Sequence, residues 1–85
     1  MRHRKLDRRM NGYGDFKYTV QFQFSEKEKF CEIREWCWEQ WGPSREFNIW
    51  DNTKNPAWCW TMDQYRIQLY FAGDGEYQWF LLKWT

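Results

Sequence analysis

The chain has 85 residues, of which 24% are Phe, Trp or Tyr, and its formal net charge is +1. A chain of this length is expected to form one domain. The mixture of charged residues with alternating apolar runs indicates a globular protein rather than a disordered one. No stretch approaches the roughly 18 apolar residues of a membrane span, and no apolar secretory segment opens the chain, so we expect a cytoplasmic protein. Cys31, Cys37 and Cys59 show no zinc or disulfide pattern, which fits a reducing compartment.

Charge is distributed unevenly along the chain. Residues 1–9 hold five Lys/Arg and one Asp, a net of +4, and residues 10–85 hold eight Lys/Arg and eleven Asp/Glu, a net of −3. The basic run has little to bury, and it leads into Asn11-Gly12-Tyr13-Gly14, a flexible turn former. We therefore expect residues 1–15 to form a flexible basic arm and hinge, and residues 16–85 to form a single domain.

A strand is predicted over residues 16–24, where aromatic and aliphatic residues alternate with polar ones. A helix follows over about residues 25–41. Ser25 and Glu28 have the spacing of a capping box, and Gly42 followed by Pro43 is typical of a helix end. The helix has an apolar stripe that should pack on a sheet; it consists of Phe30, Ile33, Cys37 and Trp41, with Trp38 at its edge.

Further strands are predicted around Phe47 and Ile49, over residues 58–62 and over residues 65–71. Gly73-Asp74-Gly75-Glu76 is a hairpin signal, so residues 77–84 are favoured as a last strand, although Tyr77, Leu81 and Trp84 also fit a helix capped by Asp74. The elements thus predict a two-layer α+β domain in the order β-α-β-β-β-β. One helix would cover one face of a four- to five-stranded, mostly antiparallel sheet.

The predicted helix carries four glutamates opposite its apolar stripe. Like charges at their spacings of three and four residues cost roughly 0.2–0.5 kcal/mol per pair, and no Lys or Arg lies within the row. The chain also has 8 Trp residues, more than so small a domain is expected to bury. A solvated acidic face and a row balanced by the basic arm are alternatives. The favoured hypothesis is a non-enzymatic module that binds a protein partner, or a second copy, through Glu28, Glu32, Glu35, Trp36 and Glu39.

Single-stranded nucleic-acid binding is the second hypothesis. One helix leaves the other sheet face open, and polar groups mixed with rings on such a face are typical of base-stacking platforms. An ordinary solvated sheet face would look similar. The basic arm would add phosphate contacts. The residues of this hypothesis are Arg2, Arg4, Lys5, Arg8, Arg9, Lys17, Trp50, Arg66 and Tyr70.

Catalytic, cofactor and metal-binding signatures are missing from the sequence. The single histidine, His3, lies in the predicted arm, and no phosphate-binding glycine loop or metal-binding spacing occurs. We therefore expect neither an enzyme nor a cofactor.

The C-terminal segment carries a resemblance. Residues 65–84, which end Phe80-Leu81-Leu82-Lys83-Trp84, resemble the ending of many small uncharacterised proteins of tailed bacteriophages. In those proteins an aromatic strand and a short acidic turn precede a terminal F-x-L-K-W-like run. The resemblance implies a phage gene product that acts inside an infected bacterium, and it implies no particular activity. Gly73 and Gly75 stand where those proteins more often have helix formers, which argues against their short helix in this chain.

Overall fold

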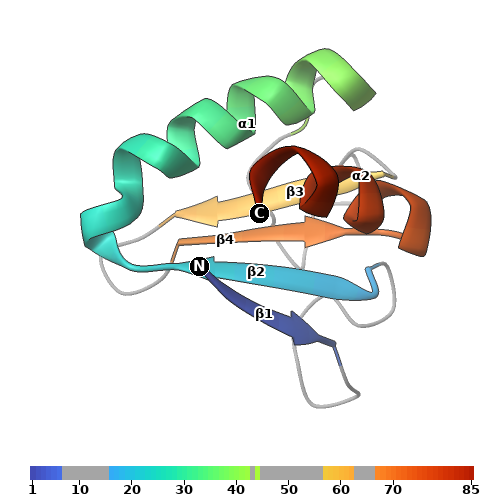
Figure 1. The fold of residues 1–85 in the computed structure, drawn as a ribbon, viewed down its shortest axis with the longest axis horizontal. Coiled ribbons are helices and arrows are strands. Elements are labelled where there is room, and N and C mark those ends of the chain that lie inside the picture. Colours follow the sequence, from blue (N-terminus) through green and yellow to red (C-terminus); the bar gives the residue numbers. More distant parts are fainter. Residues whose placement is uncertain (7–15, 43, 45–56, 63–66) are drawn as a thin grey trace.

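The computed structural model describes residues 1–6, 16–42, 44, 57–62 and 67–85. They form two layers, a four-stranded sheet with two helices on one face (Figure 1). The elements are β1 (Arg2–Lys5), β2 (Tyr18–Phe22), the 3-10 turn η1 (Phe24–Glu26), α1 (Lys27–Trp41), β3 (Trp58–Met62), β4 (Ile67–Phe71) and α2 (Asp74–Trp84). The strand order is β1-β2-β4-β3, and every neighbouring pair is antiparallel. The predicted α+β class and antiparallel sheet are confirmed.

The sheet face beneath the helices forms the main core. Apolar residues recur at alternate positions in β2, β3 and β4, as predicted. From α1 the predicted stripe contributes Phe30, Ile33 and Cys37, whereas Trp41 is half-buried with its ring 5.8 Å from that of Phe71. The buried cluster consists of Val20, Phe22, Phe30, Ile33, Cys37, Trp58, Ile67, Leu69, Phe71 and Phe80.

The two ends of α1 differ in how well they follow the sequence pattern. The predicted cap at Ser25 is wrong, because Ser25 lies within η1 and the Glu26 carboxylate accepts the backbone N–H of Gln23 at 2.9 Å. At the other end, Gly42 has a φ of 90° and donates its N–H to the Trp38 carbonyl at 2.9 Å. This positive φ favours glycine, so the predicted helix stop is confirmed.

The prediction of a flexible arm is wrong for residues 2–5. They form β1 and pair with β2, and the next residue, Leu6, is buried and donates its N–H to the Lys17 carbonyl at 2.8 Å. The signal was missed because an edge strand tolerates an all-charged sequence and needs no apolar alternation. The remaining arm residues, Arg8 and Arg9 among them, lie outside the described residues. So do the predicted strand at residues 47–49 and the predicted turns at 51–56 and 63–65.

The prediction of a hairpin turn and last strand is also wrong, because residues 74–84 form helix α2. Asp74 and Glu76 lie in its first turn, where negative charge is favourable. Phe80 is fully buried, and Tyr77 and Trp84, three and four residues away, pack against the same core. One helix is too narrow to cover four strands, and α2 lies beside α1 on the same face (Figure 1). The short helix that the glycines argued against is thus present.

The opposite face of the sheet is buried as well, so it is not the open face that was predicted. Thr19 and Cys59 are fully buried, and Tyr70 is only 5% exposed. Phe16 was expected to point to the helix, but the chain bends at Lys17 and Phe16 joins this second face. The second core cluster contains Leu6, Phe16, Cys59 and Tyr70.

Candidate protein-binding site

The acidic row predicted from the sequence consists of Glu28, Glu32, Glu35 and Glu39. All four glutamates are exposed along α1. Among the described residues the ion pair present joins the amino group of Met1 to Glu26 at 2.7 Å, so none of the four has a partner there. The alternative in which the basic residues 2–5 neutralise the row does not hold. β1 and β3 are the two edges of the sheet, and α1 packs on β3 and β4. The repulsion within the row is therefore unrelieved by this part of the chain.

Trp36 is not the exposed anchor that was predicted. Its ring packs edge-on against Trp41 at 5.3 Å and against Trp84 of α2 at 6.1 Å. The prediction failed because it placed no second helix on that side of α1. The exposed indole of α1 is Trp38, which is 51% exposed. Its ring makes neither a ring contact nor a hydrogen bond with the described part of the chain.

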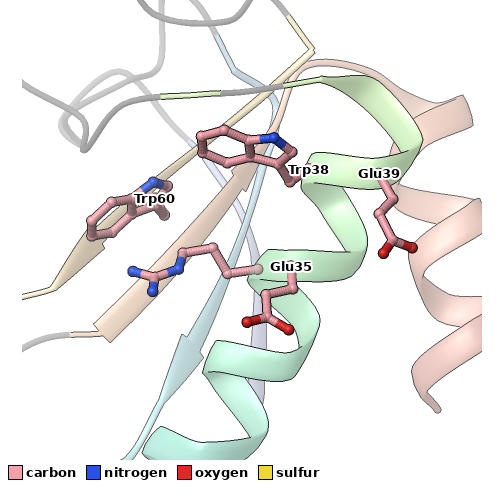
Figure 2. A pocket seen from close by; sticks show the side chains of 5 residues that line it. Glu35, Trp38, Glu39 and Trp60 are labelled. Atoms are coloured by element: carbon pink, nitrogen blue, oxygen red, sulfur yellow. The ribbon is translucent and has the colours of Figure 1, made fainter.

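A pocket of about 550 Å³ lies between α1 and β3; it is lined by Arg34, Glu35, Trp38, Glu39 and Trp60. Figure 2 shows Trp38 and Trp60 on the same side of α1, with Glu35 and Glu39 along the outer side of the helix. The pocket thus combines two large rings with two carboxylates that have no described partner. Sequence reasoning missed its aromatic part, although Trp38 stood at the edge of the apolar stripe and Arg34 lies one turn before it.

The floor of the pocket already accommodates a cation. The Arg34 guanidinium lies 4.7 Å from the centre of the Trp60 ring and 5.7 Å from that of Phe30. The Trp60 ring also packs edge-on against Phe30, and its Nε1 is buried without a hydrogen-bond partner among the described residues. A guanidinium over an indole face is a favourable cation–π arrangement. Arg34 thus covers the Trp60 ring, and Trp38 is the ring of the pocket with no described cation over it.

The shifted pKa values belong to structural contacts outside this pocket. Burial raises the pKa of the Cys37 thiol, so this cysteine stays protonated and is a poor nucleophile. The hydroxyl of Tyr18 donates to Asp74 at 2.6 Å, and this bond lowers the pKa of Asp74 and raises that of Tyr18. The bond between Tyr18 and Asp74 joins β2 to α2.

The residues of the nucleic-acid hypothesis are only partly brought together. Tyr70 is buried and its hydroxyl donates to Gln68 at 2.6 Å, so its ring is not offered for base stacking. Trp50 and Arg66 lie outside the described residues. The exposed cations that remain are Arg2, Arg4, Lys5 and Lys17. The prediction that Tyr70 offers its ring for base stacking is thus wrong. The described part of this hypothesis that remains is a group of exposed cations on and beside the edge strand β1.

No protein-family model matches this chain, and no curated protein or solved structure matches it significantly. In the described ranges no group of three or more His, Cys, Asp or Glu residues could hold a metal ion. Neither helix of those ranges has the length and apolar character needed to cross a membrane. The pocket between α1 and β3 is therefore interpreted from its own geometry.

Proposed function

We propose that this chain is a non-enzymatic interaction module that binds a basic segment of another protein in the pocket between α1 and β3. The observation that carries the proposal is the position of Trp38, half exposed at the rim of a pocket that Glu35 and Glu39 also line. An exposed large ring next to unpaired carboxylates is suited to an arginine or lysine side chain, which can stack on the indole and pair with a carboxylate.

The energetics favour a cationic partner over a neutral one. A cation over an indole contributes about 0.5–2 kcal/mol, depending on how far the pair is removed from water. The same cation relieves the repulsion between Glu35 and Glu39, which are one turn apart. Arg34 on Trp60 shows the kind of contact that an incoming arginine would repeat on Trp38. The acidic row beyond the pocket would steer a basic segment toward it.

We further propose, from the C-terminal resemblance, that the protein is phage-encoded and that its partner is a host or phage protein in the cytoplasm of an infected bacterium. Cys31, Cys37 and Cys59 form no disulfide, which is compatible with that reducing compartment.

Selection of ligands from a bead-displayed random peptide library tests the proposal. We expect the selected peptides to be enriched in Arg or Lys. We expect Trp38→Ala, and separately Glu35→Lys, to weaken their binding about tenfold or more, as measured by fluorescence anisotropy. Phe24→Ala is the control, since Phe24 is 68% exposed but does not line the pocket.

Two results would contradict this function. One is enrichment of peptides without basic residues, and the other is binding that Trp38→Ala leaves unchanged. Single-stranded oligonucleotide binding that falls steeply with salt and is lost in Arg2→Ala and Arg4→Ala would instead favour the basic edge formed by β1.

A further inference from the structure

The outer face of α2, centred on Leu82, is apolar. Leu82 is 77% exposed on the side of the helix opposite the buried Phe80, and Trp79 borders this face, where its Nε1–H donates to Gln40 of α1 at 3.0 Å. A groove of about 480 Å³ follows this side; its lining carries no charged residue and consists of Gln78, Leu81, Leu82 and Thr85. An exposed leucine beside an uncharged groove is typical of a contact surface.

Gly75 lies in line with Leu82 on this face, and the chain's own structure does not require a glycine there. A Cβ added at Gly75 would meet nothing within 4 Å, whereas one added at Gly73 would lie 2.9 Å from a Glu76 oxygen. Gly75 is also not among the described glycines with positive φ. Glycine is the poorest helix former after proline. Gly75 thus leaves a position without a side chain on the surface of α2, and it lowers the stability of this helix.

We propose that α2 is a self-association surface on which the helices of two copies pair in antiparallel orientation. A two-fold axis between positions 78 and 79 brings Leu82 of each copy onto Gly75 of the other, because the two positions are equally far from the axis. A second copy is thus complementary in shape, with a large side chain facing a position without one.

The charges of α2 fit the same arrangement. Glu76 lies in the first turn and Lys83 in the last turn. They are seven positions apart and so share one flank of the helix, which in the antiparallel pair places Lys83 of one copy near Glu76 of the other. A parallel pair would instead place the charged flanks of the two copies on opposite sides of the helix pair, where Glu76 and Lys83 would not meet. The charge pattern therefore selects the antiparallel orientation and a second copy as the occupant.

Sedimentation equilibrium over a wide range of protein concentration tests this pairing. The mass should rise from 10.9 kDa toward twice that value. Gly75→Ala should weaken the dimer about tenfold, because the new methyl group displaces the partner's Leu82. The same substitution should raise the unfolding temperature of the dilute monomer, because alanine is the better helix former. These opposite effects separate an interface role of Gly75 from a structural one.

Further variants make the test specific. Leu82→Ser should weaken the dimer without unfolding the monomer, and Phe24→Ala, another exposed apolar residue away from α2, should leave the mass unchanged. Glu76→Lys and Lys83→Glu should each weaken pairing, and the two together should restore it. A protein that stays monomeric at every concentration, or a dimer indifferent to Gly75→Ala and Leu82→Ser, would overturn the proposal. Binding of basic peptides at Trp38 is measured separately, so neither result depends on the other.

Discussion

Trp58 is a fully buried indole of β3, the strand that also carries Trp60 of the pocket. Its Nε1–H donates to the Gly42 carbonyl at 2.9 Å, and its own carbonyl accepts the Ser44 hydroxyl at 2.9 Å. Through these bonds β3 is tied to the C-terminal end of α1. Trp60, which lines the pocket, is two residues further along β3, so these bonds join α1 to the strand that carries it.

We expect Trp58→Phe to lower the free energy of unfolding by about 1–3 kcal/mol. The substitution leaves a small cavity and deprives the Gly42 carbonyl of its donor. Urea denaturation measures the change, and Trp38→Phe, at a 51% exposed indole without a described hydrogen bond, is the matched control that should stay within about 0.5 kcal/mol of the wild type. Equal effects of the two substitutions would show that the Trp58 contacts do not stabilise the fold.

At this same scale, periodicity alone could not decide which tryptophan of α1 is exposed. Trp36 and Trp38 flank the apolar stripe on opposite sides, and the sequence pattern treats either as a border position. The choice is made by α2, whose Trp84 covers Trp36. The acidic residues, in contrast, were correctly placed on an exposed face because their spacing fixes them opposite the stripe.

The acidic row lowers the stability of α1, because its glutamates repel one another at spacings of three and four residues. Glu35 has Glu32 three residues before it and Glu39 four residues after it. The positions four before and three after it hold Cys31 and Trp38, so no cation offsets the repulsion at these spacings. We expect Glu35→Gln to raise the free energy of unfolding by about 0.4–1 kcal/mol at low ionic strength, because two repulsions are removed.

Thermal unfolding at low and high salt measures this effect. The gain should shrink as salt screens the row, while binding of basic peptides should weaken in the same variant. A Glu35→Gln protein that is less stable than the wild type at low salt would show that the row is neutralised in the folded chain.

Among the elements, α2 shows why a short segment can be misassigned. Gly73 and Gly75 are strong turn signals, and residues 77–84 are rich in β-forming aromatics. What decides the helix is tertiary: the sheet face beside α1 needs cover, and Phe80 supplies it from a helix. The longer elements were predictable because α1, β2 and β4 each carry one uninterrupted period.

For the molecule as a whole, the sequence was sufficient for the α+β class and insufficient for the edges of the sheet. Alternation in strands and periodicity in helices arise where one face of an element is buried. These patterns therefore identify only the elements that contribute side chains to the core. β1 buries few side chains of its own, and it is held by backbone pairing with β2 and by side-chain contacts to α2. The second sheet face was expected to be open because only the helices were counted as cover, and residues such as Leu6 and Phe16 were not.

The contact between β1 and α2 makes stability depend on pH. The Nδ1 atom of His3 lies 2.9 Å from the Tyr77 hydroxyl, and its ring packs near Phe80. Partial burial, and next the nearby terminal amino group, lower the pKa of His3 below its ordinary value of 6.5. Between the lowered pKa and 6.5 the unfolded chain therefore binds more protons than the folded one, and stability is lost as the pH falls through this window.

We expect the unfolding temperature to drop between about pH 7.5 and about pH 5.5, and we expect His3→Gln to remove most of that drop. The lowered pKa of Asp74 acts in the same direction but at more acidic pH, below this range. Scanning calorimetry of both proteins at the two pH values provides the measurement. An unfolding temperature that rises on acidification would mean that the folded protein favours protonated His3.

The pairing of the first strand with the last helix has a consequence for how the chain acquires its structure. His3 and Tyr77 are 74 positions apart, and Tyr18 of β2 pairs with Phe71 of β4, which comes 53 positions later (71 − 18 = 53). A nascent chain cannot complete this closure until Tyr77 has left the ribosome. The aromatic strands must therefore wait for partners that are translated much later, and local contacts alone cannot assemble the sheet.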